Sequence, residues 1–152
     1  MEESIMQSDT ADRIRERFDL SKRDIKTYSP LTLAFMGDCV FDLFIRTMLT
    51  AGGNRGVNGL HKYKSNLLNA KAQSAMADLI ADILTAEETD VYKRGRNAKT
   101  ASHAKNADLS DYHKATGFEA LLGYLYLDGR EERVHEIMEY AVKEYRKSGK
   151  KE

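Results

Sequence analysis

Two stretches of this sequence are apolar around the whole circumference of a helix, and each contains a single charged residue. The first covers residues 30–41, and its only charge is Asp38. The second covers residues 115–127, and its only charge is Glu119. Because a helix that is apolar on every side is usually buried, we expect both stretches to form buried helices.

The rest of the chain also favours helices. Pro30 is the only proline in 152 residues, and the alternating β-branched runs between turn dipeptides that mark strands are missing. No internal repeat and no Gly/Ser-rich linker divides the chain. The sequence therefore predicts an all-α bundle of about seven helices, built as a single domain over residues 1–152 with flexible ends at about 1–10 and 147–152.

Capping signals locate the helices along the chain. Ser29 followed by Pro30 marks a helix start. Thr85 with Glu88 three residues later fits a capping box, and Asp108 or Ser110 is suited to begin a later helix. With the apolar periodicity, these signals predict helices over about 30–49, 57–83, 85–94, 108–127 and 131–146, after a weaker amphipathic turn at 14–20.

Charge and cysteine content narrow the setting and the class of ligand. The 24 Lys and Arg residues balance the 24 Asp and Glu residues, so a polyanion would have to bind to a local basic patch. Cys39 is the only cysteine and has no partner for an intramolecular disulfide. No signal peptide or membrane span is evident. We expect a cytoplasmic protein without a membrane partner.

The two lone carboxylates need compensation. An ionised carboxylate in an apolar site must find a cationic side chain, take up a proton or help to bind a metal ion. From spacing alone, a structural salt bridge or a local groove at Asp38 and Glu119 is favoured over a functional site. The neighbouring Gly37, Gly117 and Gly123 indicate close helix packing, and they also leave room for a hydrated metal ion and a phosphate.

A basic segment at residues 93–105 supplies the local positive charge. Its basic residues are Lys93, Arg94, Arg96, Lys99, His103 and Lys105. Arginine binds phosphate with two parallel donors, and lysine adds a point charge. A solvated surface loop is an equally good interpretation of this segment by itself. Oxygen ligands beside phosphate contacts favour Mg²⁺ or Mn²⁺ over zinc.

Three segments taken in order resemble a known family. The helix segment Phe35-Met-Gly-Asp-Cys-Val40 and the later segment 116–128 resemble the signature helices of the ribonuclease III catalytic domain. The resemblance is closest to the short bacterial Mini-ribonuclease III family through residues 33–46, 94–99 and 115–120, and it spans about residues 25–145.

This resemblance implies a fold and an activity. The fold is an all-α homodimer with the ribonuclease III endonuclease-domain arrangement and no double-stranded-RNA-binding domain. The activity is Mg²⁺-dependent endonucleolytic cleavage of double-stranded RNA, with Mn²⁺ as a substitute ion and with 5′-phosphate and 3′-hydroxyl ends as products. The family is associated with maturation of large-subunit ribosomal RNA, so a ribosomal RNA precursor is the implied partner.

The resemblance also assigns residues. Asp38 and Glu119 are implied as the catalytic, metal-binding carboxylates. Two further acidic positions of the larger family are Ala34 and Thr116 here, and this reduced set is similar to the pattern of the Mini family. Asp42, one turn beyond Asp38, either faces the same site or lies on an exposed helix face, and the exposed position is favoured. Thr116 offers at most a neutral oxygen. The basic segment, rather than the resemblance, supplies the first candidates for RNA binding, which are Lys93, Arg94, Arg96 and Lys99.

The other residues of the two apolar helices are expected to serve packing. Phe35, Met36, Phe41, Phe44, Phe118, Leu121, Leu122 and Leu125 are assigned to the core or to a dimer interface. Cys39 is expected to be a small buried hydrophobe rather than a nucleophile.

Two rival functions stay open. One is a non-catalytic RNA-binding or ribosome-associated domain of the same fold, and the retention of Asp38 and Glu119 argues against it. The other is a dimeric helical scaffold that binds protein and has no RNA affinity.

Overall fold

The computed structural model describes residues 9–54, 56, 67–99 and 108–148, and the elements are defined within these ranges. Every element in these ranges is helical, which confirms the all-α prediction. The described residues form six α-helices, one fewer than the predicted number of about seven. The α-helices are α1 (Thr10–Arg17), α2 (Pro30–Ala51), α4 (Ala70–Ile80), α5 (Ala86–Arg96), α6 (Leu109–Leu127) and α7 (Glu131–Lys147), and short 3₁₀ helices cover Ile25–Thr27 and Ala81–Ile83.

Local hydrogen bonds start the helices where the sequence predicts. The Ser29 side chain accepts the Thr32 N–H at 3.2 Å, so α2 begins at Pro30. In α5, the N–H of Glu88 donates to Thr85 Oγ1 at 3.1 Å and the N–H of Thr85 donates to Glu88 Oε1 at 2.9 Å, which completes the predicted capping box. Asp108, rather than Ser110, caps α6.

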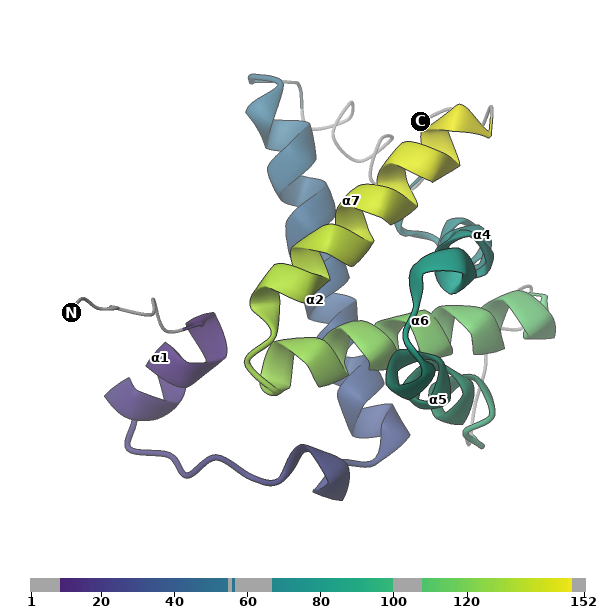
Figure 1. Cartoon of the computed structure of the whole chain (residues 1–152). Coiled ribbons are helices and arrows are strands. Elements are labelled where there is room, and N and C mark those ends of the chain that lie inside the picture. The colour runs from purple at the N-terminus through teal and green to yellow at the C-terminus, as the bar shows by residue number, and fades with distance from the viewer. Residues whose placement is uncertain (1–8, 55, 57–66, 100–107, 149–152) are drawn as a thin grey trace.

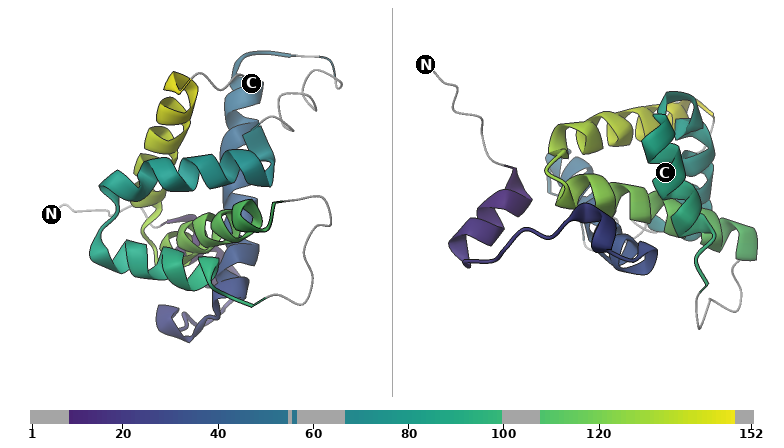
Figure 2. Two further views of the ribbon diagram at one scale, coloured as in Figure 1. Left: turned by 90° about the vertical axis from the view of Figure 1, so that its right-hand side faces the viewer. Right: turned by 60° about the horizontal axis from the view of Figure 1, so that its bottom comes forward.

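Helix α6 is the central element of the fold. Figure 1 shows α6 crossing α2, and Figure 2 shows α4, α5 and α7 arranged around it. Every residue from Ala115 to Leu125 is buried except Glu119. The second apolar stretch is therefore a buried helix, as predicted, and its one charge, Glu119, is partly buried, as are Tyr126 and Leu127 at its end.

Helix α2 differs from the prediction because it is buried on one side only. Leu33, Phe41 and Ile45 are in the core, whereas Phe35 is 79% exposed and Leu43 is 64% exposed. Cys39 is also exposed, so its expected burial is wrong for the single chain. The reason is that α6 covers one face of α2, and within the described ranges no element covers the opposite face.

The helix predicted over residues 57–83 is interrupted. Residues 57–66 lie outside the described residues. At Asn69 the chain leaves the helical conformation, and the Asn69 side chain accepts the Ala72 N–H at 2.7 Å, so that a new helix, α4, begins at Ala70. Asparagine competes for backbone donors in this way, and apolar periodicity did not detect it.

Helix α1 lies at the edge of the molecule and is joined to α2 by an extended segment (Figure 2). None of the described helices is both long enough and apolar enough to cross a bilayer.

Candidate active site

The crossing of α2 and α6 brings the two lone carboxylates to one place. A Cβ atom added at Gly37 would lie 1.6 Å from the backbone oxygen of Glu119, and one added at Gly123 would lie 2.0 Å from the backbone oxygen of Leu33. Only glycine permits two helix backbones to approach so closely. The close-packing interpretation of these glycines is therefore correct, and the crossing sets Asp38, the residue after Gly37, beside Glu119.

The Asp38 and Glu119 side chains interact directly. Asp38 lies at an exposed position of α2, and Glu119 is partly buried on α6. Burial, the negative charge of Asp38 and a hydrogen bond with Asp38 together raise the pKa of Glu119 from 4.5 to about 8. Because burial and a neighbouring carboxylate both disfavour ionisation, Glu119 holds a proton at neutral pH.

Helix α4 adds a third side chain, Gln73, that the sequence analysis missed. Gln73 is 4% exposed, and its Nε2 donates to Glu119 Oε2 at 3.2 Å. This hydrogen bond lowers the pKa of Glu119 and so partly opposes burial. The sequence signal that could have revealed Gln73 is its position as a polar residue among the apolar residues of the helix around 70–80.

The donor set fits a hard divalent cation. It consists of two carboxylates, and within the described ranges no cluster of three or more His, Cys, Asp or Glu side chains is placed to hold a metal ion. The ion pairs formed among the described residues include neither Asp38 nor Glu119. An oxygen site with few protein ligands suits Mg²⁺, which keeps several of its waters.

Asp42 and Thr116 make their hydrogen bonds along their own helices. Asp42 Oδ1 accepts from Arg46 Nε at 2.7 Å on the surface of α2, which matches the favoured helix-face position. Thr116 is buried, and its hydroxyl donates to the backbone oxygen of Tyr112 at 3.0 Å.

Helix α5 brings the basic residues close to this part of α6. A Cβ atom at Gly95 would lie 2.6 Å from Ala120 Cβ, and one at Gly117 would lie 2.7 Å from the backbone oxygen of Tyr92. The two helices therefore touch at residues close to Glu119 in the sequence, and Gly95 itself lies in the last turn of α5.

The basic segment begins in a helix rather than in a loop. Lys93, Arg94 and Arg96 form the last turn of α5, and Lys99 follows it. Arg94 Nε lies 3.3 Å from Asp90, and the Arg96 guanidinium lies 5.7 Å from the centre of the Tyr92 ring. Apart from Arg96, which is half-buried, these four basic residues are exposed. His103 and Lys105 lie outside the described residues.

Comparison with known proteins agrees with this arrangement. The Ribonuclease III domain family matches residues 31–130. The chain is 47% identical to Mini-ribonuclease 3 of Thermoanaerobacter sp. over 81% of this chain and 87% of that protein. It is 43% identical to Mini-ribonuclease 3 of Clostridium tetani over 88% of this chain and 89% of that protein.

A solved structure shares the fold. The crystal structure of protein FN1578 from Fusobacterium nucleatum superimposes with a TM-score of 0.70 at 34% identity, covering 80% of this chain and 97% of the other. The domain match spans both carboxylates and the basic turn. The chain therefore belongs to the ribonuclease III domain family and, within it, to the Mini-ribonuclease 3 proteins.

Proposed function

We propose that this protein is a Mg²⁺-dependent endoribonuclease that cleaves double-stranded RNA, with Asp38 and Glu119 as its catalytic, metal-binding carboxylates. The observation that carries the proposal is the carboxylate pair at the α2–α6 crossing, in which Asp38 and burial raise the pKa of Glu119 to about 8. A structural salt bridge would have lowered that pKa. Family membership supplies the reaction class.

In the proposed reaction, water attacks the phosphorus atom and the bond from phosphorus to the 3′ oxygen breaks, which leaves 5′-phosphate and 3′-hydroxyl ends. Asp38 and Glu119 would hold Mg²⁺, or Mn²⁺ in its place, and the ion would supply a lowered pKa of the attacking water and compensation of the charge on the phosphate. Both side chains would supply ligand oxygens, and Glu119 would have to give up its proton to do so. Asp42 and Thr116 stay predictions as supporting positions.

The last turn of α5 is the proposed RNA-binding surface. Lys93, Arg94, Arg96 and Lys99 contact the phosphate backbone in this proposal. Support comes from the position of the basic turn at the α5–α6 contact. The α6 residues in that contact, Gly117 and Ala120, lie within one helical turn of Glu119. Double-stranded RNA is recognised mainly through its shape and backbone, which such a basic turn suits.

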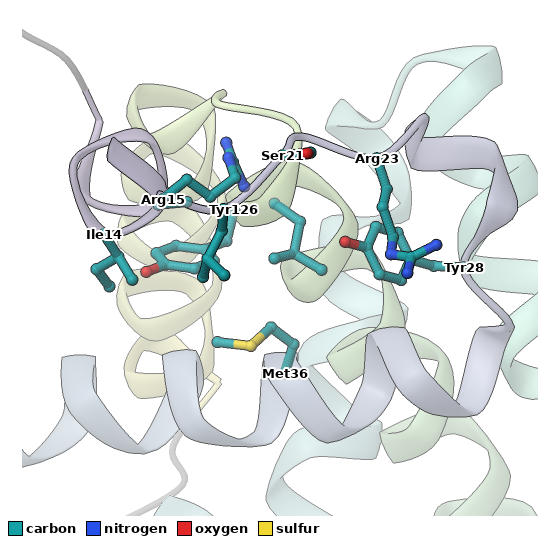
Figure 3. Close-up of a pocket in the computed structure, with 10 residues that line it drawn as sticks. Ile14, Arg15, Ser21, Arg23, Tyr28, Met36 and Tyr126 are labelled. Atoms are coloured by element: carbon teal, nitrogen blue, oxygen red, sulfur yellow. The ribbon is translucent and has the colours of Figure 1, made fainter. Parts of the chain in front are cut away.

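A second copy of this chain is the proposed partner for the uncovered face of α2. Leu31, Phe35 and Leu43 are exposed along one side of the helix. Beside them is a pocket of about 700 Å³ between α1, α2 and the end of α6, into which Met36 points (Figure 3). Apolar surface of this kind marks an interaction site. A symmetric homodimer would cover it and supply two active sites for the two RNA strands.

The proposed natural substrate is a precursor of large-subunit ribosomal RNA. This proposal rests on the resemblance to the Mini-ribonuclease III family. The cytoplasmic setting stays a prediction from the single cysteine.

Cleavage of a perfectly paired RNA duplex tests the proposal. We expect cutting with Mg²⁺, none with EDTA, and none in the Asp38→Asn and Glu119→Gln variants, which keep the side-chain shape and remove the charge. RNA binding without cutting would favour a non-catalytic RNA-binding domain. A protein without RNA affinity would instead be a scaffold.

A further inference from the structure

Gln73 is a buried polar side chain that is hydrogen-bonded to Glu119. It is 4% exposed, close to the values of its neighbours Ala72 and Ala77. A buried amide is costly unless it is hydrogen-bonded, and the Nε2 group of Gln73 donates to Glu119 Oε2 at 3.2 Å. The contact joins α4 to α6 across 46 positions of sequence.

The contact also restrains the Glu119 carboxylate. A carboxylate on a glutamate side chain can rotate about its terminal bonds unless a neighbour holds it. The side-chain amide of Gln73 on α4 holds one oxygen of Glu119. The direction in which the Glu119 carboxylate faces is therefore set by α4 as well as by α6. Groups that hold metal ligands in this way commonly change metal affinity about 10- to 100-fold when they are mutated.

The charge of the donor matters as much as its position. Elsewhere in this protein a buried carboxylate, Glu88, has a cationic partner, since both of its oxygens accept from Arg133 at 2.8 Å. Such a partner neutralises the carboxylate. An amide holds Glu119 without adding positive charge, so the negative charge of the Asp38–Glu119 pair stays available to a divalent cation.

We propose that Gln73 is a positioning residue that fixes the Glu119 carboxylate beside Asp38 and, because it is uncharged, sets the affinity of the pair for a divalent cation. This inference rests on the proposed function. In this role Gln73 acts through Glu119 and does not touch RNA.

Mn²⁺ binding in the absence of RNA tests this role, measured at pH 8 by isothermal titration calorimetry. Gln73→Met keeps the side-chain length and removes the donor, so we expect affinity to fall about 10- to 100-fold. Gln73→Glu keeps the shape and adds a carboxylate, so we expect affinity to rise above that of the wild type, because the charge of the ligands tunes such sites. Ser74→Ala, at an equally buried neighbouring position, is the control and should bind like the wild type.

A merely structural role would not move affinity in opposite directions in the two variants. As a second readout, cleavage by Gln73→Met should be slow at low Mg²⁺ and recover at high Mg²⁺, while its RNA affinity in EDTA equals that of the wild type. If wild-type protein does not bind Mn²⁺, the proposed function fails. If the wild type binds it, Glu119→Gln does not, and both Gln73 variants retain wild-type affinity, the role of Gln73 is wrong and the proposed function stands.

Discussion

Two glutamates in the core show how the same side chain serves stability or chemistry. Burial alone would raise the pKa of Glu88, but hydrogen bonds from Arg133 and from the Thr85 N–H outweigh burial and lower it. At Glu119, burial and the charge of Asp38 raise the pKa to about 8. The structural ion pair that the sequence allowed at Glu119 is thus found at Glu88, and Glu119 is held by an uncharged amide instead.

The pKa of Glu119 predicts how the stability of the metal-free protein depends on pH. Because the folded-state pKa is raised from 4.5 to about 8, the unfolded state releases this proton first, and stability falls as pH rises across that interval. Glu119→Gln has no such proton. In EDTA we expect the melting temperature of Glu119→Gln to rise relative to that of the wild type between pH 5 and pH 8. The difference should grow by a few degrees, since 1 kcal/mol corresponds to roughly 2–4 °C for a protein of this size. Melting curves that keep a constant separation across this range would contradict the raised pKa.

Glycines fix how the helices cross. Gly37 and Gly123 lie at the α2–α6 contact, and Gly95 and Gly117 lie at the α5–α6 contact. All four cost helix propensity, about 1 kcal/mol each relative to alanine. They let helix backbones meet where a Cβ atom would collide. As a result α2, which carries Asp38, and α5, which ends in the basic turn, both lie against the same part of α6.

Gly37→Ala should therefore disrupt the α2–α6 crossing. The new Cβ would meet a backbone oxygen at 1.6 Å, and a backbone atom cannot move aside as a flexible side chain can. Overpacking typically costs about 1–3 kcal/mol, and here we expect a decrease of about 3 kcal/mol or more in the free energy of unfolding, measured by urea denaturation. Gly56→Ala is the matched control, because its Cβ would have no neighbour within 4 Å. Equal stability of the two variants would disprove the tight crossing.

The basic turn of α5 predicts salt-dependent RNA binding. Replacing Lys93 and Arg94 with glutamine should weaken binding to duplex RNA and reduce the slope of log affinity against log salt, by about 1 for each phosphate that is no longer neutralised. Fluorescence anisotropy in EDTA across a salt series measures this slope without cleavage. Lys143→Gln on α7, an exposed lysine paired with Glu139, should leave the slope unchanged. A slope that responds to Lys143 instead would place the RNA on another face.

At the level of the whole molecule, the single chain leaves several large apolar side chains of the described residues exposed. Phe18 is 71% exposed near the end of α1 and Phe35 is 79% exposed on α2. Phe35 also lies one helical turn before Cys39, which is exposed as well. A second copy of the chain is the proposed cover.

Phe35→Asp should therefore convert the protein to a monomer. A charge in an apolar interface is left without a partner, whereas the fold should persist because Phe35 is outside the core. Light scattering coupled to size-exclusion chromatography gives the mass, and circular dichroism checks the fold. Leu109→Asp, at a 50% exposed leucine at the start of α6, should keep the wild-type mass. A wild-type protein that is already monomeric at micromolar concentration would contradict the homodimer.

The sequence by itself determined the helical class, most helix starts and the two unusual carboxylates. Caps such as Ser29, Thr85 and Asp108 act within a few residues of the chain, so local chemistry reveals them. A lone charge in an apolar helix is equally visible in the sequence. The family resemblance implied that Asp38 and Glu119 share a site. Only the tertiary structure decided that they meet at a helix crossing, that Gln73 reaches the pair from α4 and that α2 leaves one face open. These depend on where helices cross, and no periodicity along a single segment encodes which distant segment packs against it.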